Sequence, residues 1–126
     1  MYKLLITGSG GAIGALARYG VGLFIPSSAN AIPYSTLFIN GIGSFVLACL
    51  TYSVFKDEEN EKLKLFFGTG LCGGFTTMST FALEVSNLVT SNPVYGFIYL
   101  LASMAMGLVM AWLGFITVSR LGRKAN

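Results

Sequence analysis

Long apolar segments alternate with short polar stretches along this chain of 126 residues. Each apolar segment approaches the ~20 residues that a helix needs to cross a bilayer. The pattern predicts an all-α integral membrane protein whose four transmembrane helices form a single domain, residues 1–126. The predicted helices span residues 4–25, 34–55, 65–89 and 94–118. They are joined by an uncharged linker (residues 26–33), a charged loop (residues 56–64) and a turn (residues 90–93).

The third segment differs from an ordinary membrane helix. Between Gly68 and Glu84 it combines glycines with threonines, a serine and a final carboxylate. Glycine costs a helix interior about 1 kcal/mol relative to alanine, and Ser and Thr compete for backbone hydrogen bonds. Non-helical backbone at membrane depth is tolerated only where it is buried in protein or lines a wet cavity. We therefore expect this helix to be broken mid-membrane, at the functional centre.

Composition supports a membrane location. The chain is 54% hydrophobic and 10% charged, against about 25% charged residues in a soluble domain. Its net charge of +3 comes from the ends and one loop, which indicates contact with membrane lipid and no nucleic acid. With no histidine and scattered acids, no metal-ligand cluster is expected. Cys49 and Cys72 are interpreted as small buried residues rather than a disulfide or metal pair.

The basic residues outside the spans fall on one side of the predicted membrane. The first and third loops contain no Lys or Arg. Because cytoplasmic loops carry an excess of these residues, both termini are predicted to be cytoplasmic. The residues counted are Lys3, Lys56, Lys62, Lys64, Arg120, Arg123 and Lys124.

The glycines of the first segment suggest two readings. Residues 2–14 look like the nucleotide-binding turn of short-chain dehydrogenases, but the acidic residue and the Tyr-x-x-x-Lys pair that should follow are missing. The better reading is helix packing. Gly10, Gly14, Arg18 and Gly22 recur every four residues and share one face, and Gly10-x-x-x-Gly14 permits close approach of a neighbouring helix.

Two ionisable residues lie within the predicted spans, and such residues are functional candidates. Arg18 has three possible roles: it supplies positive potential at a vestibule, pairs with Glu84, or extends to the interface. Glu84 either lines a pore, relays protons, or only bonds neighbouring hydroxyls. The sequence leaves these alternatives open.

Polar residues of the second segment share one helical face. Thr36, Asn40, Gly43 and Ser44 follow the spacing i, i+4, i+7, i+8. Asn40 either bonds a neighbouring helix or faces a pore, and we favour the pore because of the broken third segment.

Met78 and Phe81 lie on the same side of the third segment as Glu84. They either pack in the core or, for the ring, present a positive edge to an anion.

Three motifs follow one another along the chain. The first helix carries a glycine pattern ending in arginine, the second a Thr–Asn–Gly pattern, and the third the glycine and hydroxyl run. They read Gly10-Gly-x-x-Gly14-Ala-x-x-Arg18-Tyr19, Thr36-Leu-x-x-Asn40-x-x-Gly43 and Gly70-x-Cys72-Gly73-Gly74-Phe-Thr76-Thr77-x-Ser79-Thr80-Phe81-x-x-Glu84.

With these motifs, four spans and this length, the chain resembles the Fluc/CrcB family of fluoride channels over essentially its whole length. The resemblance implies an antiparallel, dual-topology dimer with two narrow fluoride pores. It also implies a central Na⁺ held by the backbone carbonyls of Gly73 and Thr76. Asn40 would donate to fluoride, Phe81 would supply one pore phenylalanine, and Arg18 would sit near a vestibule. The residues implied to form or flank the polar track are Thr36, Ser79, Thr80 and Glu84.

Two positions depart from the family pattern. Met78 stands where the family usually has its first pore phenylalanine, and Gly107 stands where members often carry a serine, with Ser103 one turn away. The one-sided Lys/Arg count also conflicts with a chain that inserts both ways. Either the acids of the charged loop and late packing offset it, or the partner is a paralogue. We favour a homodimer over this heterodimer.

The interpretation that follows is a passive, Na⁺-dependent fluoride channel of the cell membrane, which exports fluoride and is not an enzyme. The alternative is a small proton-coupled multidrug exporter that uses Glu84. Such exporters carry their glutamate in the first helix, where this chain has Arg18 and no acid. A third possibility is a non-transporting assembly subunit, which leaves the glycine-rich third helix unexplained.

Overall fold

The computed structural model describes residues 1–25, 32–54 and 60–124, with side chains as far as Leu121. Lys56 and the side chains of Arg123 and Lys124, which enter the orientation count, lie outside the described residues. All elements of the described part are helical. They are α1 (Tyr2–Phe24), α2 (Tyr34–Ser53), α3 (Glu61–Leu63), η2 (Lys64–Cys72, a π-helical run), α4 (Gly73–Phe75), α5 (Met78–Ser91) and α6 (Pro93–Lys124).

The predicted segments correspond to these helices with differences at the ends. The fourth segment was expected to end at residue 118, but α6 continues to Lys124. The residues that follow 118 include basic ones, and none of them is a proline that would stop the helix. Between α5 and α6 only Asn92 leaves the helical conformation. Its side-chain Oδ1 accepts a hydrogen bond from the Tyr95 N–H at 3.3 Å, so it caps α6, and Pro93 occupies the first helical position, where proline is favoured.

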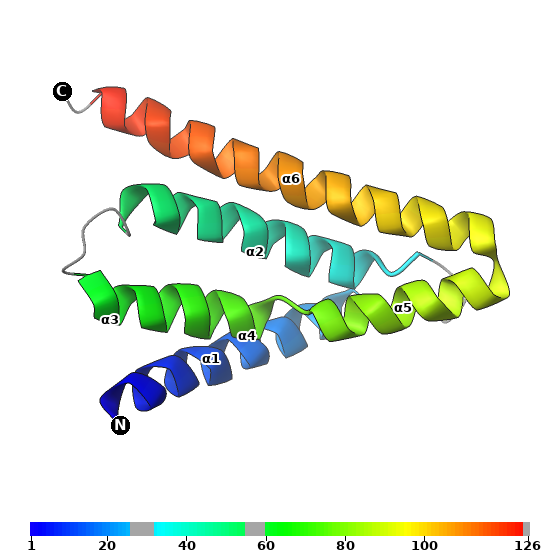
Figure 1. Cartoon of the computed structure of the whole chain (residues 1–126), viewed down its shortest axis with the longest axis horizontal. Coiled ribbons are helices and arrows are strands. Elements are labelled where there is room, and N and C mark those ends of the chain that lie inside the picture. The colour runs from blue at the N-terminus through cyan, green and yellow to red at the C-terminus, as the bar shows by residue number, and fades with distance from the viewer. Residues whose placement is uncertain (26–31, 55–59, 125–126) are drawn as a thin grey trace.

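The helices lie side by side as four long runs, which are α1, α2, the third run from α3 through η2 and α4 to α5, and α6 (Figure 1). The N-terminus, α3 and the C-terminal end of α6 lie at one end of the molecule, and the turn between α5 and α6 lies at the other (Figure 1). α1 therefore runs parallel to the run from α3 to α4 and packs on η2 and α4, while α6 packs on α2 and α5. The helix ends that carry Lys3, Lys62 and Arg120 share one end of the molecule, as the orientation count requires.

The third run is interrupted at two residues. α4 ends at Phe75, and Thr76 (φ −74°, ψ 158°) and Thr77 (φ −143°, ψ 115°) are extended before α5 begins at Met78. This change of conformation lies within the Gly68–Glu84 stretch, where glycine and hydroxyl side chains weaken the helix. The depth of these residues in a membrane stays a prediction.

Glycines bring α1 into backbone contact with the third run. A Cβ added at Gly10 would overlap the carbonyl oxygen of Phe66, and one added at Gly14 would overlap that of Leu71. On the other side, a Cβ at Gly74 would overlap the carbonyl oxygen of Gly11. The four-residue spacing thus predicted the packing surface at Gly10 and Gly14, whereas a Cβ at Gly22, on the same predicted face, has nothing within 4 Å.

Most large apolar side chains of the described residues are exposed. The buried cluster consists of Phe81, Leu88 and Tyr99, between α5 and α6. Side chains such as Leu108 (72% exposed) and Trp112 (61%) point away from the molecule. An apolar exterior suits a protein surrounded by lipid or by another subunit.

Two of the described helices are long and apolar enough to cross a membrane, Tyr34–Ser53 and Pro93–Leu121. α1 has the length, but glycines and Arg18 lower its hydropathy, and the interruption divides the third run into short pieces. Crossing of the membrane stays a prediction for all four runs.

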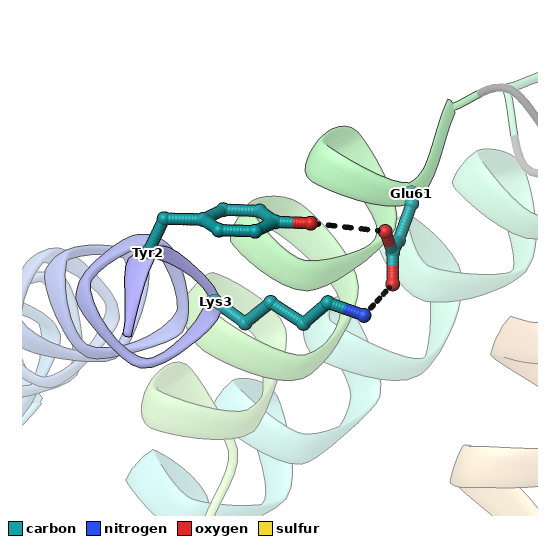
Figure 2. Close-up of polar contacts among 3 residues, drawn as sticks. All are labelled: Tyr2, Lys3 and Glu61. Atoms are coloured by element: carbon teal, nitrogen blue, oxygen red, sulfur yellow. Dashed lines mark hydrogen bonds and ion pairs between the residues drawn. The ribbon is translucent and has the colours of Figure 1, made fainter.

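The beginning of α1 is tied to the beginning of the third run. Figure 2 shows Tyr2 and Lys3 directed toward the Glu61 carboxylate of α3. Lys3 Nζ forms an ion pair with Oε1, and the Tyr2 hydroxyl donates to Oε2 at 3.4 Å. The hydrogen bond and the charge of Lys3 lower the pKa of Glu61, and Glu61 in turn raises the pKa of Lys3.

We predict that Gly14→Ala destabilises the fold by about 1–3 kcal/mol, because the added methyl group meets backbone that cannot move aside cheaply. Gly8→Ala is the matched control, because a Cβ there has nothing within 4 Å. Resistance to unfolding by SDS in mixed micelles measures the difference. Equal stability of the two variants would show that α1 and the third run are not in backbone contact.

We predict that Glu61→Gln lowers the midpoint of thermal unfolding slightly at low salt, and that high salt removes the difference, because the ion pair is exposed.

A lowered Glu61 pKa contributes stability that is present above the usual 4.5 and lost as the pH falls through the folded-state value. The raised Lys3 pKa contributes stability that is present below 10.5 and lost as the pH rises through the folded-state value. The difference between variant and parent should therefore disappear in acid. A difference in unfolding midpoint that persists in acid would show that the ion pair is not its cause. Lys62→Gln, which removes one charge from the same turn, is the control.

Candidate functional site

A hollow of about 610 Å³ lies beside the interruption of the third run. α2, the third run and α6 each contribute part of its wall. Its lining mixes amide, hydroxyl and thioether groups with one aromatic ring. The lining residues are Asn40, Gly43, Ser44, Leu47, Gly68, Thr69, Cys72, Gly73, Thr76, Thr77, Met78, Phe81, Ser103, Met104 and Gly107.

Asn40 holds the interruption from the side of α2. Its Oδ1 accepts a hydrogen bond from the Thr77 N–H at 2.8 Å, and its Nδ2 donates to the Thr77 carbonyl at 3.0 Å. The side-chain amide thus pairs with both backbone groups of one extended residue. A primary amide has two N–H donors, so one remains after this pairing.

Thr77 is buried and is the N-cap of α5. Its Oγ1 accepts from the Thr80 N–H at 3.2 Å and donates to Thr80 Oγ1 at 2.8 Å, and it lies 3.4 Å from Ser79 Oγ. This is the geometry of an N-cap, which satisfies a backbone donor that the first turn leaves without a partner. The predicted residues Ser79 and Thr80 are exposed and cluster around this cap.

Glu84 is held by two hydroxyl groups from neighbouring helices. Thr36 Oγ1 donates to Oε1 at 2.8 Å, and the hydroxyl of Tyr99, a fully buried residue, donates to Oε2 at 2.7 Å. Of the three roles considered for Glu84, the structure shows the hydrogen bonds with neighbouring hydroxyl groups. Arg18 does not pair with it: its Nη1 donates to the Thr76 carbonyl at 3.3 Å instead.

Phe81 and Met78 face different surroundings. Phe81 is buried, and its ring centre lies 5.5 Å from that of Tyr99 at a tilt of 50°. Met78 is 73% exposed and lines the hollow at the first turn of α5. Phe81 therefore separates the hollow from the Thr36–Glu84–Tyr99 network, while Met78 is free to adjust to whatever occupies the space.

The carbonyls expected to hold Na⁺ both belong to residues that line the hollow, Gly73 and Thr76. In a continuous helix the Gly73 carbonyl would accept from the Thr77 N–H, which here bonds Asn40. The Thr76 carbonyl accepts from Arg18 and retains one lone pair. Among the described residues no group of three or more His, Cys, Asp or Glu side chains could hold a metal. Backbone carbonyl oxygens are ligands of the kind that a hard cation takes, and a Na⁺ at Gly73 and Thr76 stays a prediction.

The structure brings most of the predicted residues together in two groups. Asn40, Gly73, Thr76, Met78 and Phe81 line the hollow, whereas Thr36 and Glu84 form the network behind it. Ser79 and Thr80 lie outside both groups, around the Thr77 cap, and Arg18 reaches the interruption from α1. Sequence reasoning missed Tyr99 and the pairing role of Thr77. The i, i+4, i+8 spacing of Tyr99 with Ser103 and Gly107 would have placed it on the face of α6 toward the hollow.

Comparisons with known proteins agree on one family. The family model described as CrcB-like protein, Camphor Resistance (CrcB), matches residues 5–115. The fluoride-specific ion channel FluC of Thermotoga maritima is 41% identical over 110 residues, 85% of this chain and 87% of the relative. FluC 2 of Bacillus subtilis is 40% identical over 105 residues (83% and 79%), and a FluC of Thermus thermophilus is 35% identical over 117 residues (91% and 94%). Since the match spans most of the chain in each case, the chain belongs to the CrcB family.

Proposed function

We propose that the chain forms a fluoride-selective channel of the cell membrane, through which cytoplasmic fluoride leaves passively. The observation that carries the proposal is the similarity, over most of both chains, to relatives named fluoride-specific ion channels. The hollow beside the interrupted helix supports it, because amide and hydroxyl groups line part of a wall that is otherwise mostly apolar.

The chemistry of the hollow suits a small, strongly hydrated anion. Such an ion gives up water only where closely placed donors replace it. The remaining Nδ2–H of Asn40 is a donor of this kind within the hollow, and the positive edge of the Phe81 ring adds a weaker contact. The hydroxyls of Ser79 and Thr80 lie outside the lining, around the Thr77 cap, and are proposed to serve the ion path next to the hollow. Met78 completes the wall with a flexible thioether.

The proposed channel is an antiparallel, dual-topology dimer, with a homodimer favoured over a heterodimer with a paralogue. A second copy would cover the apolar faces that one chain leaves exposed. A structural Na⁺ at its centre would be held by the carbonyls of Gly73 and Thr76. When bound, the cation supplies fixed positive charge that balances backbone oxygens released from helical hydrogen bonds.

Transport in this scheme needs no covalent step, so the protein is proposed to be no enzyme. An inside-negative membrane potential drives the anion outward, by about 2.3 kcal/mol per charge for each 100 mV. The proton-coupled exporter finds no support in the site. It needs a carboxylate that exchanges protons and substrate, whereas both Glu84 oxygens accept hydrogen bonds from hydroxyls.

We predict that the purified chain alone, reconstituted in liposomes, releases fluoride rapidly and chloride at least about a hundredfold more slowly. The reason is that hydroxyl and amide donors placed for a small anion lose contact with a larger one. Ion-selective electrodes follow both ions, with protein-free liposomes as the control. Equal release of both ions would contradict selectivity. Fluoride release only after a paralogue is added would contradict the homodimer.

We predict that Glu84→Gln retains fluoride efflux within about tenfold of the parent chain. The amide oxygen can still accept from one hydroxyl, and the amide N–H can donate to the other. The same electrodes measure it, and Glu61→Gln, which removes a carboxylate far from the hollow, is the matched control. Complete loss of transport in Glu84→Gln alone would favour the proton-coupled exporter.

A further inference from the structure

We propose that Arg18 is a positioning residue that acts together with Asn40 on a single peptide group, the one that joins Thr76 to Thr77. The proposal assigns Arg18 a contact that none of the sequence alternatives included. As far as it concerns ion passage, it rests on the proposed function. The orientation of the peptide group can be tested separately.

The two side chains bond opposite ends of the same peptide plane. Arg18 Nη1 donates to the Thr76 carbonyl at 3.3 Å, and Asn40 Oδ1 accepts from the Thr77 N–H at 2.8 Å. None of the described peptide bonds is cis, and in a trans peptide the C=O and N–H point in opposite directions. Arg18 of α1 and Asn40 of α2 therefore hold the plane from opposite sides.

Both ends of this peptide group lack their helical partners. The Thr76 carbonyl would accept from the Thr80 N–H in a continuous helix, but that N–H bonds Thr77 Oγ1. The Thr77 N–H would reach the Gly73 carbonyl, but it bonds Asn40. In apolar surroundings an unpaired backbone group is costly, so side chains of neighbouring helices must replace the lost bonds.

The glycine spacing of α1 explains why Arg18 arrives at this place. Gly14, one turn earlier on the same face, lies against the backbone of Leu71 and Phe75, where α4 ends. One turn further along α1, the third run is no longer helical, because α4 has ended at Phe75. Arg18 is the first large side chain on the glycine face of α1, after Gly10 and Gly14. Its long stem spans the gap and brings the guanidinium N–H donors to the Thr76 carbonyl.

Loss of this contact would let the peptide group rotate about its ends. The Thr76 carbonyl would turn away, and the start of α5, with Met78 and the Thr77 cap, would shift with it. Arg18 would thus act on the ion path through backbone geometry. A vestibule role would instead act through charge alone, so the two roles predict different outcomes for the same variants.

Cys72 offers a native reporter of the peptide orientation. It is 3% exposed and lies at the end of η2, and its carbonyl accepts from both the Thr76 N–H and Thr76 Oγ1. With Cys49→Ser as background, the rate of Cys72 labelling by N-ethylmaleimide is measured in the full-length protein in liposomes. Arg18→Leu is expected to raise this rate about tenfold, the change that follows loss of a hydrogen bond to a charged group. Arg18→Lys, which keeps a donor of similar reach, should restore slow labelling.

Matched controls and a second variant keep the test decisive. Leu16→Ala alters an exposed side chain of α1 and should leave labelling unchanged. If Arg18→Leu does not purify folded, Arg18→Gln replaces it, because its side chain is polar but too short to reach Thr76. Parental labelling in Arg18→Leu or Arg18→Gln, with fluoride efflux reduced, would overturn the proposal in favour of a role through charge. The labelling experiment tests the orientation of the peptide group whether or not the chain conducts fluoride.

A double-variant cycle tests whether both residues act on one peptide group. Asn40→Leu removes the other hydrogen bond and should also raise the labelling rate. If the peptide group is shared, Arg18→Leu combined with Asn40→Leu should label more slowly than the product of the two single increases, because the first loss already frees the group. Multiplicative increases would show that the residues act independently and would overturn the shared clamp.

Discussion

The paired hydrogen bonds between the Asn40 amide and the Thr77 backbone are the interaction on which the site depends. Two extended residues in the middle of a helical run leave backbone groups without their helical partners, and such groups are costly in apolar surroundings. Asn40 bonds both the N–H and the C=O of Thr77, while the Thr77 hydroxyl caps α5, the helix that follows. The interruption persists because side chains replace the helical bonds, and the hollow lies beside it as a consequence.

The rest of the fold brings these partners into reach. Gly10 and Gly14 let α1 contact the backbone of the third run. This contact sets the register between the two helices, and so places Arg18 beside Thr76. On the opposite side, Thr36 and Tyr99 hold Glu84 and so tie α5 to α2 and α6. Close glycine contacts and hydroxyl–carboxylate bonds are both short-range, so the helices around the site have little freedom to slide.

Periodicity and composition predicted the helical segments, the packing face of α1 and the stretch in which the helix is interrupted, because these depend on local preference. They did not predict the partner of Asn40, which lies 37 residues away in the sequence. That pairing depends on the register between two helices, and one sequence carries no signal for it. Tyr99 was missed for a related reason: an aromatic residue in an apolar helix is usually core. Its spacing with Ser103 and Gly107 indicates its face of α6, but its bond to Glu84 depends on how two helices pack. The family resemblance supplied fluoride and Na⁺, which the residues alone do not specify.

Fluoride efflux from liposomes that contain the Asn40→Leu variant tests the central claim most directly. Leucine has nearly the shape of asparagine but can make neither bond to Thr77 and offers no donor to an anion. The account predicts that the variant still folds and inserts, and that its fluoride efflux falls at least about tenfold below that of the parent chain. Efflux at the parental rate would contradict the account, because it would show that the interruption and the ion path do not depend on Asn40.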